Sequence, residues 1–386
     1  MLSQFGFVGM KWMKKTWVSI PDVLFFQEGP GVRNTQYTIV GVKLLNVANL
    51  VDGKIDLSTS DRYISEKEAY GKYKHFLCDA GDFIIASSGI KVEYIDKKMG
   101  FVDESMLPLC MNTSTIRFKV LDEKQLRIRY FMYYLKSEHF KQQLFKQITG
   151  SAQLNYGPSH LKKMIMPLID LNDQDEIVSC MDKVQNIIEK RQQELYRLDD
   201  LIKARFVEMF ESVQETCEIG YYIKALIAGK SLAGESECEN KVLKTGAVSF
   251  DYFDASQIKN LPVDYKPQKE HLVNVGDLII SRMNTAELTG ATAYVWSVPD
   301  KVYIPDRLWK AILEEKCNPI FVWQMLIQPS TKEQIQRECS GTSGSMKNIS
   351  KAGMLGIKVK KVNIDMQNDF ADFVKQVDKS KFMKSF

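Results

Sequence analysis

The chain has 386 residues, of which 45% are hydrophobic and 26% are charged, a composition typical of globular proteins with two or three domains. Its 52 basic and 48 acidic residues leave a net charge of +4, which permits an acidic partner such as nucleic acid but does not require one. The seven cysteines are odd in number and none are spaced as CxxC, so we expect reduced thiols rather than a disulfide framework or a zinc site.

The N-terminal sequence MLSQFGFVGMKWMKKTW lacks a basic region followed by an apolar region, so it does not predict a signal peptide. No stretch of the chain approaches the roughly 20 apolar residues that a membrane-spanning helix needs. Together these features predict a cytoplasmic protein with no membrane partner.

The first half of the chain begins with strand-like segments. β-Branched and aromatic residues cluster at Tyr37–Leu45, Asp82–Ser87 and Thr115–Val120, which predicts three strands. A helical pattern follows over Gln125–Gln147. After it come a segment rich in small polar residues, ITGSAQLNYGPS (Ile148–Ser159), and a short strand-like piece.

Residues 173–210 carry the pattern of one long amphipathic helix. Apolar residues recur in steps of four and three, the spacing of a heptad seam, which Arg191 and Arg205 interrupt. A lone helix of this kind needs a partner that covers its apolar side. The seam consists of Ile177, Met181, Val184, Ile188, Leu195, Leu198, Ile202 and Met209.

The second half of the chain follows the same order. Strands are predicted at Asp277–Ser281, Thr292–Val298 and Leu308–Leu313, and a helix at Phe321–Glu338. The small polar segment CSGTSGSMKNIS (Cys339–Ser350) comes next. A final amphipathic stretch, residues 367–386, places three apolar residues where they match the seam of the long helix: Phe370, Val374 and Val377.

Three blocks of the two halves align in one order. GDFIIASSG (81–89) corresponds to GDLIISRMN (276–284) with an offset of 195, which is 276 minus 81. LKKMIM (161–166) corresponds to MLGIKV (354–359) with an offset of 193, which is 354 minus 161 and also brings Gln174 onto Gln367. A small polar segment precedes the second block in both halves. The sequence therefore predicts a duplicated α+β architecture, with two β-rich modules separated by an antiparallel pair of coiled-coil-like helices.

The two helices of the predicted pair differ in length, because the second is about half as long as the first. Two interpretations follow: either the pair stops early, or something else covers the Leu195–Met209 end of the first helix.

The two small polar segments have a plain and a functional interpretation. Glycine lets the backbone approach a ligand closely, and hydroxyl and free N–H groups can hold phosphate oxygens. The side-chain amides of Gln153, Asn155 and Asn348 match the donor and acceptor of adenine, and Lys347 adds a positive charge. The plain interpretation is a turn between a helix and a strand, where the same residue types are common.

The segment GTSGSMKNISKAGMLGIKV (341–359) resembles the closing part of a target recognition domain from the specificity (S) subunit of type I restriction-modification systems. GSAQLNYGPSHLKKMIMPL (150–168) is similar to a second form of that part. GDLIISRMNTAELTGATAYV (276–295), GKS (229–231) and VLKTGAVSF (242–250) also resemble the family. Two features depart from its usual pattern: PLIDLNDQDEI (167–177) is less proline-rich, and the C-terminal helix is short.

The resemblance implies a first target recognition domain at residues 1–168, a first spacer helix at 169–212, a second recognition domain at 213–360 and a short second spacer helix at 361–386. It also implies that the chain does no chemistry and binds no cofactor. Each recognition domain would read one half of a bipartite double-stranded DNA site, and the helices would set the gap. Two methyltransferase (M) subunits would modify adenine N6 with S-adenosylmethionine, and two restriction (R) subunits, which use ATP and Mg²⁺, can join them.

Two sets of candidate residues follow from the polar segments and the resemblance. The flanks of the long helix, such as EKRQQE (Glu189–Glu194), would face the M subunits or be merely solvated. The candidates for DNA contact are Ser343, Ser345, Lys347, Asn348, Lys351, Arg282, Asn284, Ser151, Gln153, Asn155, Ser87 and Ser88, and those for a subunit interface are Ile177, Met181, Val184, Ile188, Leu195, Leu198, Ile202, Phe370, Val374 and Val377.

The main alternative is a catalytic protein. Asp300 after a proline, followed by Glu314 and Lys316, has the PD…ExK spacing of many Mg²⁺-dependent nucleases, in which two carboxylates hold the metal and a lysine orients the attacking water. AGKS (228–231) lacks the first glycine of a phosphate-binding P-loop. A third possibility is a scaffold whose β-rich modules bind protein. The salt dependence of binding affinity distinguishes a protein-binding scaffold from a DNA-binding protein, because phosphate-driven binding weakens steeply as salt increases.

Overall fold

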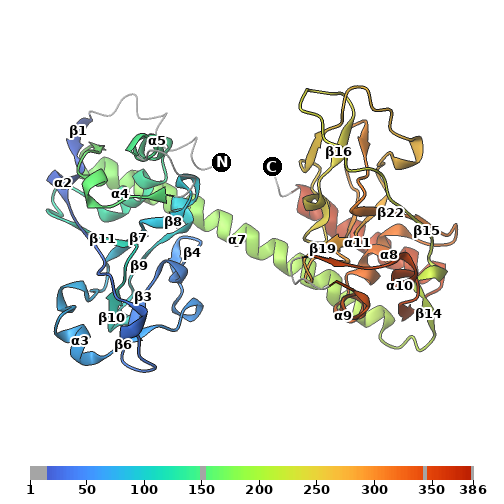
Figure 1. Cartoon of the computed structure of the whole chain (residues 1–386), viewed down its shortest axis with the longest axis horizontal. Coiled ribbons are helices and arrows are strands. Elements are labelled where there is room, and N and C mark those ends of the chain that lie inside the picture. Colours follow the sequence, from blue (N-terminus) through green and yellow to red (C-terminus); the bar gives the residue numbers. More distant parts are fainter. Residues whose placement is uncertain (1–14, 148–153, 342–345, 384–386) are drawn as a thin grey trace. The chain divides into compact units, whose positions relative to one another are not determined.

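The computed structural model describes residues 15–147, 154–341 and 346–383. The chain divides into two compact units, residues 1–190 (unit 1) and residues 191–386 (unit 2), shown in Figure 1. The division falls inside the long helix α7 (Leu171–Phe210), which begins in unit 1 and ends in unit 2. Each unit combines small β-sheets with helices, so the predicted α+β class is confirmed.

Unit 1 is built on an antiparallel four-stranded sheet in the order β2-β11-β7-β9. All four residues of β7 are buried, because α4 covers one face: the Phe131 ring lies 5.0 Å from that of Phe118 and 6.4 Å from that of Phe83. A second sheet has the order β10-β3-β6, with β10 parallel to β3. The strands of these sheets are β2 (Leu24–Glu28), β3 (Val42–Leu45), β6 (Tyr63–Ile64), β7 (Phe83–Ala86), β9 (Met99–Phe101), β10 (Leu109–Met111) and β11 (Thr115–Val120).

Smaller elements complete unit 1. Two short strand pairs, β1–β13 and β8–β12, join distant parts of the chain, and β4 and β5 form a hairpin. The bounds are β1 (Thr16–Ser19), α2 (Ile20–Val23), β4 (Leu50–Val51), β5 (Lys54–Ile55), α3 (Glu66–Tyr70), β8 (Ser88–Ile90), α4 (Ile128–Leu135), α5 (Glu138–Gln147), β12 (Leu154–Asn155), α6 (Pro158–Leu161) and β13 (Ile165–Leu168).

Unit 2 repeats the two larger sheets and the two short strand pairs of unit 1, without an equivalent of the β4–β5 hairpin among its described residues. Its four-stranded sheet has the order β15-β22-β18-β20, its three-stranded sheet the order β17-β16-β21 with β16 parallel to β21, and its strand pairs are β14–β24 and β19–β23. The bounds are β14 (Thr216–Glu218), β15 (Ile223–Ile227), β16 (Lys241–Leu243), β17 (Ile258–Asn260), β18 (Leu278–Ser281), β19 (Met283–Asn284), β20 (Thr292–Tyr294), β21 (Val302–Tyr303), β22 (Leu308–Leu313), α8 (Pro319–Leu326), α9 (Pro329–Glu338), β23 (Lys347–Asn348), α10 (Lys351–Leu355), β24 (Lys358–Lys360) and α11 (Ile364–Met383).

The predicted strands lie where expected except at two ends. Residues 115–120 and 308–313 are strands over their full predicted length. The strand predicted over Tyr37–Leu45 begins only at Val42, because Ile39 and Val40 are exposed and lie outside the sheet. The strand predicted over residues 292–298 ends at Tyr294. Each predicted helical stretch before a polar segment is two helices rather than one.

Gly29 and Gly229 show the duplication at the level of single atoms. Each follows the first strand of its four-stranded sheet. A Cβ added at Gly29 would lie 2.0 Å from the Asn112 carbonyl oxygen, and one added at Gly229 would lie 1.9 Å from that of Ile304. Only glycine fits so close to a neighbouring backbone, so the same packing constraint acts in both units.

Gln174 and Gln367, which the sequence alignment pairs, make equivalent hydrogen bonds. The Gln174 Oε1 accepts from the Arg127 N–H (2.8 Å), and its Nε2 donates to the Ile169 carbonyl (2.8 Å). The Gln367 Oε1 accepts from the Asn318 N–H (3.0 Å), and its Nε2 donates to the Val362 carbonyl (2.8 Å). Both side chains are buried near the start of a long helix and tie it to the unit behind it.

Gln367→Leu should lower the free energy of unfolding of unit 2 by about 2 kcal/mol, because it leaves a buried N–H and a buried carbonyl without partners. Urea denaturation of the full chain measures this. Gln336→Leu, at an exposed position on α9, is the matched control and should shift stability by less than about 0.5 kcal/mol. Equal effects of the two substitutions would contradict the tethering role of Gln367.

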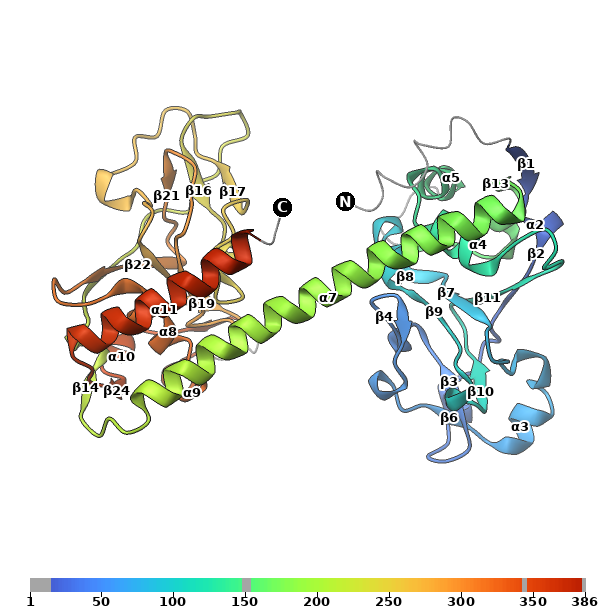
Figure 2. The same cartoon turned by 180° about the vertical axis from the view of Figure 1, so that it is seen from behind.

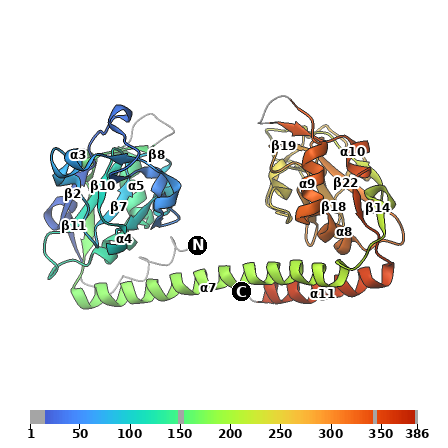
Figure 3. The ribbon, with the colours of Figure 1, turned by 90° about the horizontal axis from the view of Figure 1, so that it is seen from below.

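In unit 2 the C-terminal part of α7 packs antiparallel against α11, as Figures 2 and 3 both show. The Phe210 ring lies 5.5 Å from that of Phe370, and further back along α7 the Arg205 guanidinium lies 5.8 Å from the Phe373 ring. Phe206 and Phe210, which the predicted seam omitted, are buried beside Ile202. The helical pair is therefore confirmed within unit 2, with a seam shifted toward the two phenylalanines.

Among the described residues, no helix has the length and apolar character needed to cross a membrane.

Candidate functional site

A two-stranded ribbon in unit 2 brings together four of the predicted residues. β19 and β23 pair antiparallel, with Met283 opposite Asn348 and Asn284 opposite Lys347. The Ile349 N–H also donates to the Arg282 carbonyl (3.1 Å). Residues 65 positions apart in sequence (348 minus 283) therefore form one surface element, directly after the buried strand β18.

Further hydrogen bonds join β23 to Ser340 and Gly341, which precede it in the chain. Lys347 Nζ donates to the Gly341 carbonyl (2.8 Å), and the backbones of Ser340 and Asn348 exchange two hydrogen bonds (2.9 and 3.0 Å). Gly341 has φ +133°, and a Cβ there would lie 2.7 Å from the Met346 carbonyl oxygen, so this position requires glycine. Part of the small polar composition therefore has a conformational cause, as the plain interpretation proposed.

Arg282 occupies a distinctive place at the base of the ribbon. Its guanidinium carbon lies 5.5 Å from the centre of the Trp309 ring, a cation–π arrangement, and Trp309 is 1% exposed. The Arg282 Nε is buried and has no hydrogen-bond partner among the described residues. The Asn348 Oδ1 is likewise buried without a partner there. Buried polar atoms without a hydrogen-bond partner are uncommon in folded proteins.

The corresponding ribbon of unit 1 is β8–β12, in which Asn155 lies opposite Ser88. Ser87 precedes it and is 1% exposed, with its Oγ donating to Glu28 Oε1 (3.2 Å). The Tyr156 N–H donates to the Ser87 carbonyl (3.0 Å), the same link that joins Ile349 to Arg282. The side chain of Ser87 is therefore engaged inside the unit, whereas Ser88 is partly exposed.

The Tyr156 hydroxyl lies buried next to this ribbon. It donates to the Ala86 carbonyl (2.8 Å). Burial, and then the negative charge of Glu28, raise the pKa of Tyr156 well above its usual value. The tyrosine therefore stays a neutral hydrogen-bond donor at physiological pH.

The remaining predicted DNA contacts are one exposed lysine and five residues whose side chains the structure does not describe. Lys351 is exposed at the first turn of α10, which Ser350 caps by accepting the Gly353 N–H at its Oγ (2.9 Å). The side chain of Asn155 is not among the described ones, although its backbone is. Four predicted residues lie outside the described ranges: Ser151, Gln153, Ser343 and Ser345.

The predicted interface residues differ in how far they are covered. Ile188 and Leu195, in the middle of α7, are each 40% exposed, and their neighbours Ile187 and Tyr196 are 61% exposed. Leu198 is partly buried in the unit 2 core, while Ile177, Met181 and Val184 are partly buried at the start of α7. Four others are buried inside unit 2 and pack within this chain, which leaves no surface for a partner subunit: Ile202, Phe370, Val374 and Val377.

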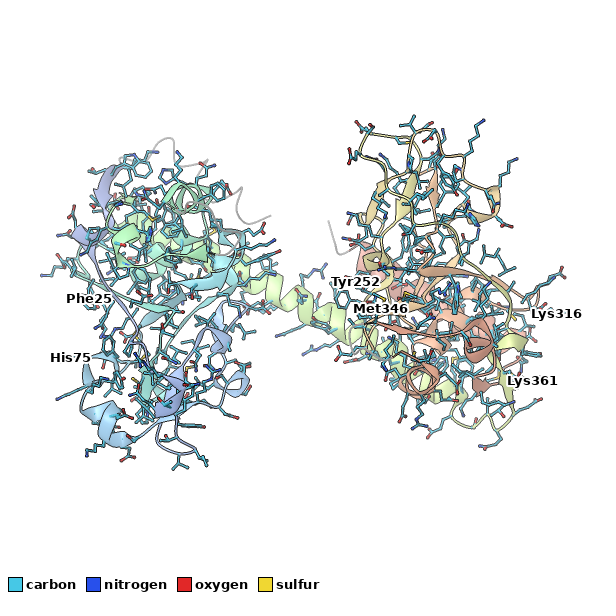
Figure 4. All side chains as sticks on the ribbon, in the orientation of Figure 1. Phe25, His75, Tyr252, Lys316, Met346 and Lys361 are labelled. Carbon is cyan, nitrogen blue, oxygen red and sulfur yellow. The ribbon has the colours of Figure 1, made fainter. Side chains whose placement is uncertain are left out.

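An anchored aromatic turn in unit 2 was not predicted. Asp251 has φ +63°, and its carboxylate accepts the Thr292 N–H (3.0 Å) and pairs with Lys332. On either side of it the stacked rings of Phe250 and Tyr252 point to solvent, 72% and 59% exposed, and Figure 4 labels Tyr252. Two aromatic residues flanking an aspartate do not predict a binding site from sequence alone. This turn is distinguished by the left-handed backbone of Asp251 and by the contacts of its carboxylate, which only the structure shows.

The residues of the nuclease alternative belong to different sheets. Asp300 lies in the turn before β21 of the three-stranded sheet, and Glu314 follows β22 of the four-stranded sheet. Within the described ranges, no three or more histidine, cysteine or acidic side chains gather in a way that could hold a metal ion.

Comparison with known proteins gives one consistent family. Residues 34–197 match the model of the type I restriction modification DNA specificity domain. The chain is 25% identical over 186 residues to the type I restriction enzyme MjaVIII specificity subunit of Methanocaldococcus jannaschii, covering 47% of this chain and 42% of that protein. It is 24% identical over 177 residues to the EcoEI specificity subunit of Escherichia coli, covering 43% of this chain and 30% of that protein. The matches thus span less than half of either relative.

The fold has a counterpart among solved structures. The S subunit of a type I restriction-modification system from M. genitalium superimposes with a TM-score of 0.50 at 16% identity, covering 97% of this chain and 91% of that one. At 16% identity the similarity concerns the fold alone. The structural similarity covers both units, whereas the family model matches only residues 34–197.

Proposed function

Because residues 34–197 belong to the DNA specificity domain family of type I restriction-modification systems, we propose that this chain recognises a bipartite DNA sequence, one half with each unit. The observation that carries the proposal is the duplication of the ribbon. Each unit presents a two-stranded ribbon directly after the buried strand of its main sheet, with Ser88 and Asn155 in unit 1 and Asn284, Lys347 and Asn348 in unit 2. Two similar DNA-binding units on one chain are suited to a DNA site with two separated halves.

The ribbons supply the groups that DNA recognition uses. Lys347 and Lys351 in unit 2 carry positive charge suited to phosphates. Asn284 and Asn348 carry side-chain amides of the kind that pairs with base edges; the Asn284 Oδ1 accepts the Thr285 N–H (2.9 Å) and the Asn348 Oδ1 is buried, so their NH2 groups are the proposed donors. Stacked and exposed, Phe250 and Tyr252 provide a further apolar contact in the same unit.

The chemistry is proposed to lie in partner subunits, with this chain non-catalytic. Two methyltransferase subunits would use S-adenosylmethionine to modify adenine N6, and up to two restriction subunits would use ATP and Mg²⁺. The exposed apolar residues in the middle of α7, Ile187, Ile188, Leu195 and Tyr196, support docking of such partners, because apolar side chains in this number are usually covered. This activity belongs in the cytoplasm, where the DNA is.

The test is to map N6-methyladenine across the host genome with and without the gene. We expect methylation to disappear at one motif made of two half-sites and an unread gap, and to return when the gene is supplied on a plasmid. The control is any other methylated motif in the genome, which should not change. A methylome that is identical in the two strains, while the chain and its partner subunits are expressed, would contradict the proposal.

A further inference from the structure

The two units differ in charge at one equivalent position, the residue that directly follows the buried sheet strand and begins the ribbon. It is Arg282 in unit 2 and Ser87 in unit 1. Resting on the proposed function, we infer that Arg282 reads a guanine in the half-site bound by unit 2, and that unit 1 makes no such contact.

The equivalence follows from strand pairing. In unit 1, Ile116 of β11 lies opposite Ile85 of β7 and opposite Glu28 of β2. In unit 2, Trp309 of β22 lies opposite Ile280 of β18. Ser87 and Arg282 each stand two residues beyond that opposite isoleucine, and the backbone carbonyl of each accepts an N–H from the second ribbon strand.

The surroundings of the two residues also differ. Lys310, next to Trp309, pairs with Ile227, so the residue of unit 2 that corresponds to Glu28 is Ala228. In unit 1, therefore, the Ser87 hydroxyl bonds to the Glu28 carboxylate, and Ile116 occupies the position that corresponds to Trp309. Unit 2 has an arginine on a tryptophan, with no carboxylate at the matching place. The Ser87 hydroxyl is engaged inside the unit, whereas the Arg282 guanidinium makes no hydrogen bond or ion pair among the residues that the structure describes.

Packing on the indole ring restrains the guanidinium. Trp309 is buried in the core of unit 2, so the ring beside which the Arg282 guanidinium lies is fixed in position. The planar guanidinium presents its N–H groups as a fork, which matches the O6 and N7 acceptors of guanine in the major groove. Contact with phosphate needs no such restraint and is served by exposed lysines such as Lys351. The restraint therefore favours base reading by Arg282.

The experiment replaces the gene with variants in its host and maps N6-methyladenine in each strain. For Arg282→Gln we expect one G·C position, in one half-site only, to become tolerant of other bases, with discrimination there falling roughly 5- to 150-fold. Arg282→Lys should relax the same position, because lysine keeps the charge but loses the fork. The other half-site, read by unit 1, should keep its sequence.

Lys224→Gln is the matched control, since it removes one positive charge from unit 2 at an exposed position on β15, beside the far end of β22. Figure 4 shows Lys316, which follows that end of β22, and Met346, which precedes the ribbon strand β23, on opposite sides of this unit. The control should leave the motif and the extent of methylation unchanged.

Each other outcome overturns the inference. An unchanged motif in both Arg282 variants would mean that Arg282 reads nothing. If methylation decreased uniformly at all sites while the motif stayed intact, Arg282 would contact phosphate rather than a base. If all methylation were lost in both variants, Arg282 would be needed for folding. These results would not contradict the proposed function, because the wild-type strain would still show a gene-dependent methylated motif. Only the absence of that motif in the wild type would contradict both the role of Arg282 and the proposed function.

Discussion

Deleting residues 190–196 from α7 should narrow the gap in the recognised site by about three base pairs while both half-sites keep their sequence. One heptad of helix is about 10 Å long, and base pairs are stacked about 3.4 Å apart. Removal of two helical turns also keeps the apolar face of α7 in register, to within about 20°. The deleted segment lies before Leu198, where packing against the unit 2 core begins. Methylome mapping of the host with the deletion variant measures the new gap, at a lower extent of methylation, because the deletion also removes Leu195 and Tyr196 from the proposed docking surface.

A variant of equal length is the control for this deletion. Replacing exposed residues of the same heptad, Gln192→Ala and Gln193→Ala, keeps the helix at its full length. The gap should then be unchanged. If the deletion altered the half-sites and left the gap as it was, α7 would not act as the spacer, and the proposal that helix length sets the gap would be wrong.

Phe210→Ala should destabilise unit 2 by about 3–5 kcal/mol, since truncation of a buried phenylalanine leaves a cavity. Phe210 is 1% exposed, and its ring lies 4.9 Å from that of Phe206, 5.2 Å from that of Phe321 and 5.5 Å from that of Phe370. These rings join α7, α8 and α11, so one substitution loosens three helices. Urea denaturation of the full chain, followed by tryptophan emission, measures the loss, because three buried or half-buried tryptophans lie in unit 2: Trp296, Trp309 and Trp323.

Val207→Ala is the matched control, because Val207 lies on the same helix and is 49% exposed. It should change stability by less than about 1 kcal/mol. A loss for Phe210→Ala no greater than for Val207→Ala would show that the aromatic cluster does not hold the helical pair in place. The transition of unit 1 should stay where it is in both variants, which separates local packing from a general effect on the chain.

Much of the fold was predictable because the sequence repeats its local patterns. The strands at 115–120 and 308–313 are continuous apolar and β-branched runs, and burial on the sheet requires that composition. Gln174 and Gln367 aligned at a constant offset, and their hydrogen bonds proved equivalent. The seam of α7 was displaced from its predicted position, because heptad spacing does not say which of two adjacent apolar residues faces the partner helix. Phe206 and Phe210 face it, since their rings fill the space beside α8 and α11.

The sequence by itself determined the duplicated order of elements, the long helix, the repeated block that carries Arg282 and Asn284, and the polar segment that carries Lys347 and Asn348. Tertiary structure decided how these residues meet. Pairing of β19 with β23 depends on hydrogen bonds between residues 65 positions apart (348 minus 283), and local composition carries no information on such partners. The same is true of Ser87 and Arg282, which occupy one place in the two units. The Glu28 carboxylate, from a distant strand, accepts a hydrogen bond from the serine, while the arginine packs on Trp309 of another distant strand.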